Sequence, residues 1–265
     1  MSEPNLLDVA ISAAEAGARC LLDHWRQPRR IRRKGPVDLV TDADLAAESA
    51  VLRVIRAACP DDAITTEESQ GIRSIGHRRW LVDPLDGTTN FAHSHPHFAV
   101  SVAAADASGV LVAVVHDPLR DEIFRAVRGG GAWLGSSRLR VSATASLDDS
   151  LIATGFPYDR RSQPERYLGH VAAALRACQG IRRAGSAALD LAWTAAGRLD
   201  AFWEWKLAAW DVAAGSLLVE EAGGRVTTIE GTPHSLEAPS ILASNGHVHS
   251  ELGDLLRRVD VPNLV

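Results

Sequence analysis

The run of short strand-like segments between residues 63 and 134 most constrains the fold of this chain. Six apolar runs there have the length of strands, and turn residues separate them, for example at residues 106–109 and 128–131. Closely spaced strands with short turns favour an antiparallel or mixed sheet. We therefore expect sheet strands at residues 63–66, 80–83, 98–105, 110–116, 122–126 and 131–134.

The pattern changes after residue 150 to an alternation of strands and helices, which is typical of an α/β unit. We expect strands at 151–154, 199–203 and 241–244, and helices at 163–178, 187–196, 210–222 and 247–258. Two amphipathic helices precede the first sheet, at residues 5–26 and from about residue 42 to just before Pro60, with Thr41 or Asp42 as the N-cap of the second. The sequence thus predicts two halves, 1–150 and 151–265, packed into one compact body.

Composition excludes several classes of protein. The three cysteines are widely spaced and odd in number, which argues against a disulfide framework or a zinc cluster. The first residues carry acids and no basic segment, and no apolar run approaches ~18 residues, so we expect a cytoplasmic protein without a membrane span. The formal net charge of -5 is evenly spread and gives no support for nucleic-acid binding.

Residues 80–91 hold the richest cluster of polar side chains. A predicted buried strand ends at Asp83, Asp86 follows three residues later, and Gly87 permits close approach of another backbone. From Thr88 the chain has the character of an opening helical turn, whose free N–H groups can bind an anion. Paired carboxylates beside an anion site suit Mg²⁺ bridging to a phosphate. Turn chemistry alone favours an ordinary surface turn.

Further acids recur at the ends of predicted elements. One pair follows the strand at 63–66, one acid begins the helix at 210–222, and three lie at the start of the second helix: Glu67, Glu68, Asp211, Asp38, Asp42 and Asp44. Each could instead be a helix N-cap or a solvated turn residue. Spacing alone leaves open whether these carboxylates meet in space.

Seven motifs in this order resemble the inositol monophosphatase family of lithium-sensitive, metal-dependent phosphatases, over nearly the whole chain from Lys34 onward. They comprise Lys34 with residues 38–44, then residues 67–69, 80–91, 155–157, 185–187, 210–215 and 221–224. The string from Asp83 to Phe91 is highly specific. The resemblance implies an α+β fold with αβαβα layers of the sugar-phosphatase type, a homodimer, and Mg²⁺-dependent hydrolysis of inositol monophosphate.

The resemblance also implies a set of metal ligands. Glu67, Asp83 and the main-chain carbonyl of Leu85 would hold a first Mg²⁺. Asp83 would bridge to a second, which Asp86 and Asp211 complete, and a third, weaker position would lie near Glu67. Two cations of this kind neutralise the charge of a phosphate dianion and activate a water.

The resemblance assigns the catalytic roles to a few residues around the same turn. The N–H groups of Gly87 and Thr88 would take the phosphate oxygens, and Glu67 with Thr88 would orient and deprotonate a water for direct in-line attack. Asp44 would support the Thr88 hydroxyl group. Lys34 would lie near the metal entrance.

Substrate contacts follow from the resemblance as well. Glu204 and Asp86 would accept hydrogen bonds from ring hydroxyls, with the backbone of Gly185, Ser186 and Ala187 contributing. From the residues alone, Glu204 could equally be a surface acid at a strand end. The residue after Thr88 is Thr89, where relatives that act on nucleotide 3′-phosphates or histidinol phosphate commonly carry Lys. Thr66 stands where the family usually has Gly, and we expect activity to survive this departure.

Two alternatives stay open at this point. The same chemistry could act on another small ester, such as fructose 1,6-bisphosphate, histidinol phosphate or another sugar phosphate. Some bacterial relatives also resemble transcription or ribosome-assembly partners whose role need not depend on catalysis.

Overall fold

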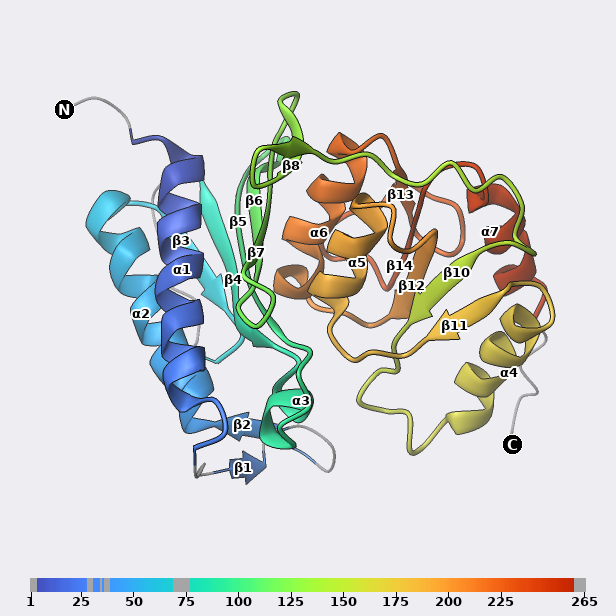
Figure 1. The fold of residues 1–265 in the computed structure, drawn as a ribbon, viewed down its shortest axis with the longest axis horizontal. Coiled ribbons are helices and arrows are strands. Elements are labelled where there is room, and N and C mark those ends of the chain that lie inside the picture. The colour runs from blue at the N-terminus through green and yellow to red at the C-terminus, as the bar shows by residue number, and fades with distance from the viewer. Residues whose placement is uncertain (1–3, 28–30, 34, 36–38, 69–76, 260–265) are drawn as a thin grey trace.

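The computed structural model describes residues 4–27, 31–33, 35, 39–68 and 77–259, so Lys34, Asp38 and Ser69 lie outside the described residues. Helices and sheets alternate in five layers across the long axis of the molecule (Figure 1). The helical layers hold α1 (Leu6–His24) with α2 (Asp42–Ala58), α5 (Ala187–Ala195) with α6 (Ala209–Glu221), and α4 (Pro164–Leu175) with α7 (His249–Arg257). The predicted layered α+β fold is confirmed.

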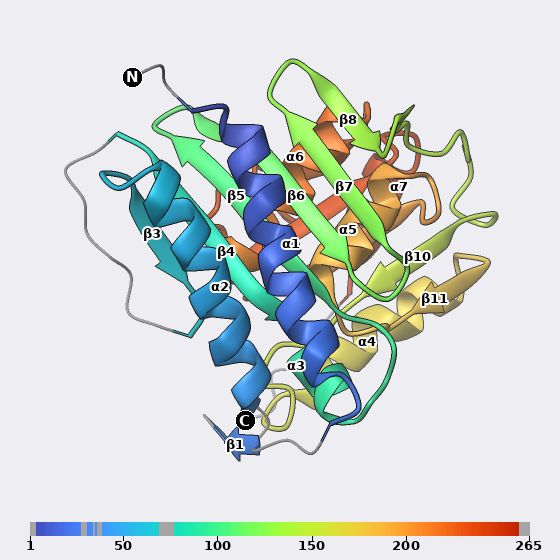
Figure 2. The same ribbon diagram turned by 60° about the vertical axis from the view of Figure 1, so that its left-hand side comes forward.

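The first sheet is mixed, as expected, because β3 pairs parallel with β4 while the remaining neighbours pair antiparallel. Helices α1 and α2 lie side by side over one face of it, and α5 and α6 lie behind it (Figure 2). Covering both faces explains why β4 is an almost uninterrupted run of buried residues. Its strands, in order, are β3 (Ala63–Thr66), β4 (Arg79–Asp86), β5 (Ala99–Asp106), β6 (Gly109–Asp117), β7 (Glu122–Val127), β8 (Gly131–Leu134) and β9 (Ser137–Arg138).

The second sheet has the order β11 (Gly180–Arg182), β10 (Leu151–Thr154), β12 (Ala201–Trp205), β14 (Ser240–Ser244) and β13 (Arg225–Thr227). The strand predicted at residues 199–203 begins two residues later than expected. Just before this strand, the carboxylate of Asp200 accepts a hydrogen bond of 2.7 Å from the N–H of Leu151, the first residue of β10. A small antiparallel pair, β1 (Ile31–Arg33) and β2 (Leu39–Thr41), precedes α2.

Side-chain size sets how closely the layers approach. A Cβ on Gly17 of α1 would lie 2.8 Å from Val51 Cγ2 of α2, so glycine permits the close contact of these two helices. Helices α5 and α6 are apolar on nearly all sides because a sheet covers each face of their layer. None of the described helices is long and apolar enough to cross a membrane.

The central core cluster joins the two halves of the chain. It contains side chains of the first sheet, of α5 and α6, and of β12 and β14 in the second sheet. The outer clusters lie beneath α1 and α2, and beneath α4 and α7. Each half thus has an outer core of its own, but both contribute side chains to the central cluster. We therefore propose that the two halves pack as one body and that the boundary near residue 150 separates them in topology only.

Candidate active site

The turn between β4 and α3 (Thr88–Ala92) requires glycine. Gly87 has φ of 98°, which L side chains rarely adopt. A Cβ there would also lie 3.0 Å from the carbonyl oxygen of His97 and 3.3 Å from that of Gly185. The side-chain amide of Asn90 donates to the His97 carbonyl at 2.8 Å and to the Ala184 carbonyl at 2.9 Å. These contacts fasten the start of α3 to the loop before α5.

An irregularity in β4 presents its acids. The register between β4 and β5 shifts between Asp83 and Asp86, where Pro84 interrupts the ladder. The N–H of Leu85 donates to Asp83 Oδ1 at 3.0 Å, which leaves the second oxygen of this buried carboxyl for another partner. A bulge of this kind re-aims side chains that a regular strand would direct to opposite faces.

The packing of α6 against β5 brings Asp211 close to Asp83. Ser101 is the cross-strand partner of Asp83, and its hydroxyl donates to the carbonyl of Trp210 at 3.3 Å. The N–H of Ala208 donates to Asp211 Oδ2 at 2.7 Å, so Asp211 stabilises the first turn of its own helix. Its carboxyl group also shares a hydrogen bond with that of Asp83.

Asp86 is held by the start of α5. The Ser186 hydroxyl donates to Asp86 Oδ2 at 2.6 Å, and the N–H of Ala188 donates to the same oxygen at 2.7 Å. Burial raises the pKa of Asp86, while these two donors and the charge of Arg183 oppose the rise. The predicted substrate contacts at Gly185, Ser186 and Ala187 thus lie directly beside a predicted metal ligand, and all line one cavity.

The four predicted metal-binding carboxylates form one electrostatic cluster. Burial first, and then the charges of Glu67, Asp86 and Asp211, hold the pKa of Asp83 well above its usual value. Burial, followed by the charge of Asp86, raises the pKa of Asp211 to about 8. Clustered carboxylates that are costly to ionise together are offset by a divalent cation. Leu85, whose carbonyl was also predicted as a ligand, is fully buried beside them.

Hard oxygen donors and excess negative charge therefore fit a divalent metal ion. Among the residues that the structure describes, no three His, Cys, Asp or Glu side chains already lie in a metal-binding arrangement. One oxygen each of Asp83, Asp86 and Asp211 is turned to a neighbouring donor instead. Carboxylate oxygens are nevertheless the hard donors that a divalent cation prefers.

Thr88 and Asp44 form a buried pair beside the turn. Thr88 Oγ1 lies 2.9 Å from Asp44 Oδ1 and 3.1 Å from the Leu85 carbonyl oxygen. Asp44 is fully buried, and its other oxygen accepts from the N–H of Thr41 at 2.7 Å and from the Thr41 hydroxyl. Since the Thr88 proton is taken by these acceptors, the hydroxyl oxygen presents lone pairs to the cavity and can orient a water.

A cavity of about 170 Å³ extends from this turn to the second sheet, and Glu204 of β12 lines it. Glu204 is only 8% exposed, so it is not the surface acid that the residues alone left possible. Burial raises its pKa to about 8, against the nearby charge of Arg183. Trp205 lines the cavity, whereas Trp203 is fully buried in the core.

Sequence reasoning gave no role to several residues that line this cavity, among them Phe156, Arg160, Arg183 and Asp190. Arg160 is only partly exposed, whereas Arg183 is exposed although it borders the cavity. Arg160 lies three residues after the motif at 155–157 and Arg183 two residues before the motif at 185–187, and that proximity could have indicated them. Asp190 lies one helical turn after Ser186, so helical spacing from the motif would have found it.

The order of these motifs matches an established family. The family model described as "Inositol monophosphatase family" covers residues 3–260. The chain belongs to the inositol monophosphatase family. Members of this family are metal-dependent phosphatases, which agrees with the carboxylate cluster, and the family predicted from the motifs is confirmed.

Individual relatives span the whole chain. The inositol-1-monophosphatase of Rhizobium meliloti is 44% identical over 261 residues, covering 97% of this chain and 98% of its own. The Nus factor SuhB of Escherichia coli is 41% identical over 264 residues, covering 96% and 99%. The crystal structure of extragenic suppressor protein suhB from Bartonella henselae superposes with a TM-score of 0.91 at 40% identity, covering 96% and 98%.

Proposed function

We propose that this chain is a magnesium-dependent phosphomonoesterase that hydrolyses inositol monophosphate to inositol and phosphate. The supporting observation is the arrangement along one cavity. A cluster of buried carboxylates adjoins the glycine turn at Gly87, and a buried polar group, Glu204, lines the same cavity. The turn and the cation ligands suit a phosphate group, and the buried carboxyl group of Glu204 suits the hydroxyls of a polyol. Together they match a phosphorylated polyol.

The metal ligands come from both halves of the chain. Glu67, Asp83, the Leu85 carbonyl, Asp86 and Asp211 would hold two or three Mg²⁺ ions. When bound, such ions neutralise the charge of the phosphate, lower the pKa of a water and stabilise the leaving oxygen. Because Ser186 and Ala188 already fix one oxygen of Asp86, only its other oxygen is free to turn toward a cation.

The remaining steps belong to the chain itself. The N–H groups of Gly87 and Thr88 bind the phosphate oxygens. Thr88, with its proton directed toward Asp44, accepts a hydrogen bond from the attacking water and aims it at phosphorus. Glu67 takes the proton that this water releases. The attack is direct and in line, and no phosphoryl-enzyme forms.

The polyol end of the substrate meets Glu204 and the backbone of the Gly185 turn. A carboxylate and main-chain groups recognise hydroxyls, whereas an apolar pocket would not. The cavity is also smaller than the ~300–1,000 Å³ of pockets that enclose drug-sized ligands, which favours a small ester over a nucleotide. Thr89 in place of the Lys of nucleotide-directed relatives points the same way.

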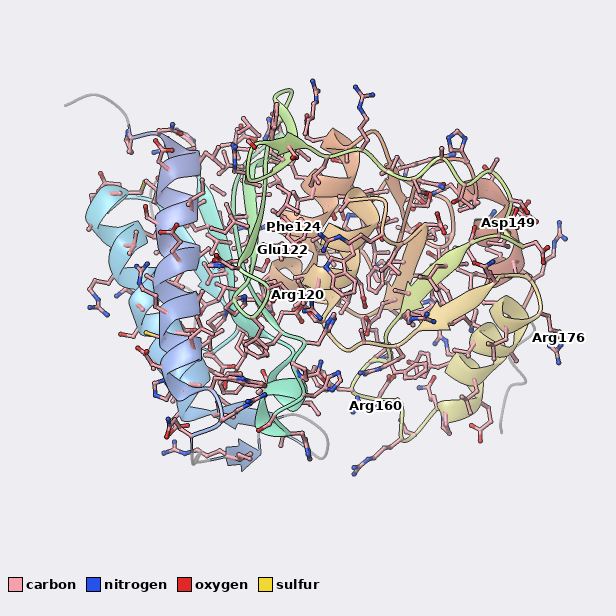
Figure 3. The ribbon with its side chains drawn as sticks, viewed as in Figure 1. Arg120, Glu122, Phe124, Asp149, Arg160 and Arg176 are labelled. Carbon is pink, nitrogen blue, oxygen red and sulfur yellow. The ribbon has the colours of Figure 1, made fainter. Side chains whose placement is uncertain are left out.

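Phosphate release from a panel of esters, with and without Mg²⁺, tests this proposal. The panel contains inositol 1-phosphate, fructose 1,6-bisphosphate, histidinol phosphate and adenosine 3′,5′-bisphosphate. We expect Mg²⁺-dependent turnover led by inositol 1-phosphate, its loss in Asp211→Asn, and its retention in Asp149→Asn, since Asp149 is exposed and far from the cavity (Figure 3). Turnover led by another ester would contradict inositol monophosphate as the substrate. The absence of any turnover would contradict the assignment as an enzyme.

A second function is favoured by one relative, the Nus factor SuhB at 41% identity. We propose that a non-catalytic role in transcription or ribosome assembly could be added to catalysis here. Complementation of a strain lacking its SuhB homologue by the Asp211→Asn variant would support that role. Complementation by the active protein alone would argue against it.

Three properties are proposed from the family resemblance alone. They are inhibition by lithium, a homodimer and a cytoplasmic location. Sedimentation velocity measures the second directly, and a Li⁺ titration of phosphate release measures the first.

A further inference from the structure

One face of α2 carries two buried carboxylates, and the proposed mechanism uses only one of them. Asp44 accepts from Thr88, whereas Glu48, which follows Asp44 by four residues, is left unused. Four residues make slightly more than one helical turn, so both side chains lie on the same face, about 6 Å apart along the axis. That face packs on the first sheet, where α2 lies beside β3 and β4 (Figure 2).

Glu48 has a hydrogen-bond partner in the turn that follows β3. The N–H of Glu68 donates to Glu48 Oε2 at 3.2 Å. Glu48 is only 6% exposed, and a buried carboxylate is costly unless it is hydrogen-bonded. The bond joins the middle of α2 to the end of β3, so it forms only when the helix packs on the sheet.

The main chain around Glu67 is therefore held on both sides. The parallel ladder between β3 and β4 pairs Thr66 with Val82, which fixes the residue before Glu67. The hydrogen bond from the N–H of Glu68 to Glu48 fixes the residue after it. Glu67, the predicted metal ligand and proton acceptor, thus lies between an anchor in the sheet and an anchor on α2.

We propose that Glu48 is a positioning residue that holds Glu67 in place for the first cation and for the attacking water. This inference rests on the proposed phosphatase function and adds a residue to its machinery. Asp44 holds Thr88, and Glu48 holds the turn of Glu67, so one face of α2 supports both groups that are assigned to the water. A rigid helix is well suited to this task, because catalytic groups have to be held by elements that do not move.

Glu48→Gln and Glu48→Met test this inference with matched side chains. Both keep the length of the side chain and remove its charge, but only glutamine keeps an oxygen that accepts from the N–H of Glu68. In E48M the dissociation constant for Mg²⁺, measured by isothermal titration calorimetry without substrate, should rise about 10–100-fold. Its kcat at saturating Mg²⁺ should fall by about a hundredfold, because Glu67 is misplaced. E48Q should resemble the unmodified protein in both, and KM for inositol 1-phosphate at saturating Mg²⁺ should change in neither variant, since the groups that bind the substrate are unaltered.

Two control variants separate positioning from general damage. L52A removes a buried side chain of α2 and should lower the free energy of unfolding, and E15M makes the same exchange as E48M at a partly exposed residue of α1. Both should keep the Mg²⁺ affinity of the unmodified protein. Equal Mg²⁺ affinity in E48M and E48Q, or an equal loss in L52A, would overturn the inference while Mg²⁺-dependent turnover by the unmodified protein still supported the proposed function. Absence of any turnover by the unmodified protein would overturn both.

Discussion

Gly155 and Glu204 pack so closely that a Cβ on Gly155 would lie 1.9 Å from Glu204 Oε2. The glycine of the motif at 155–157 therefore leaves room for the carboxyl group that we assign to substrate binding. Any larger residue must displace Glu204 from the cavity. This contact explains a glycine whose φ is not in the left-handed region.

Gly155→Ala should lower kcat/KM for inositol 1-phosphate by about a hundredfold, because misplacing a positioning group by an ångström has roughly that effect. Turnover of phenyl phosphate, which has no ring hydroxyls, should fall much less. Steady-state kinetics with the two esters measure the difference. Equal losses for both would show that the substitution disturbs the whole site and not Glu204.

Ser186→Ala should weaken Mg²⁺ binding about 10–100-fold, the usual effect of removing a partner of a metal ligand. Its hydroxyl donates to Asp86 Oδ2 and also lies 3.4 Å from the N–H of Leu189 as the N-cap of α5. The lost cap should also lower the free energy of unfolding by about 1 kcal/mol. Isothermal titration calorimetry and urea unfolding measure the two effects.

Ser216→Ala provides the matched control for that experiment. Ser216 is a buried serine of α6 whose hydroxyl has no hydrogen-bond partner among the residues that the structure describes. Its removal should be neutral or stabilising, because an unsatisfied buried hydroxyl costs free energy. A loss of Mg²⁺ affinity in this variant would indicate that any small change in this layer disturbs the site.

Thr88→Val should reduce kcat by about a hundredfold or more, the contribution typical of a positioned proton-transfer group. Valine keeps the shape but cannot accept a hydrogen bond from water or donate to Asp44. Thr88→Ser should restore most of the activity, since it keeps the hydroxyl. If serine fails to rescue, the methyl group and not the hydroxyl matters.

Magnesium binding should tighten as pH rises from about 6 to about 9. The pKa of Asp211 is raised to about 8, chiefly by burial, and that of Asp83 is raised well above its usual value. Below these values protons occupy the groups that a cation needs, so binding must release them. Calorimetry in buffers of different ionisation enthalpy counts the protons, and a count of zero would contradict the raised pKa values.

Acid should destabilise the protein through His249. Its Nδ1 lies 2.8 Å from Ser244 Oγ and its Nε2 2.9 Å from Thr227 Oγ1, and burial lowers its pKa to about 4. Between that value and the ordinary pKa of about 6.5, only the unfolded chain binds the proton. Stability contributed by the neutral ring is therefore present above about pH 6.5 and is lost as pH falls toward 4.

This histidine should contribute up to about 1.4 kcal/mol of lost stability per pH unit in that window. Urea unfolding at several pH values gives the slope for the unmodified protein and for His249→Asn, whose slope should be shallower. His247→Asn, on an exposed neighbour, should match the unmodified protein. Equal slopes for all three proteins would show that His249 does not cause the loss of stability in acid.

Much of the fold could be predicted from the sequence because interactions between residues close in the chain determine it. Thr41 and Asp42 were both predicted as possible N-caps of α2, and the structure selects Thr41, whose hydroxyl lies 3.2 Å from the N–H of Ala43. The short strands β11 and β13 were not predicted, since three residues carry no periodicity. Their existence depends on neighbouring strands and not on their own composition.

The residues of the candidate site were likewise predictable only where a local motif marks them. Asp83 and Asp86 could be predicted as candidate metal ligands because their turn has a distinctive local sequence. Arg160 and Arg183 were missed because one follows β10 and the other β11, and only the pairing of these strands brings the two side chains to one cavity. The sequence around each arginine does not show that the two side chains lie at the same cavity.

The central core cluster also bears on how such a chain can evolve. Side chains of the first sheet pack against those of α5 and α6 in one core. The carboxylates of β4 and α6 also interact electrostatically. Exchanging one half by recombination between distant relatives would mismatch both at once. The two halves are therefore expected to be inherited as a unit, with substitutions on one side of the central layer compensated on the other.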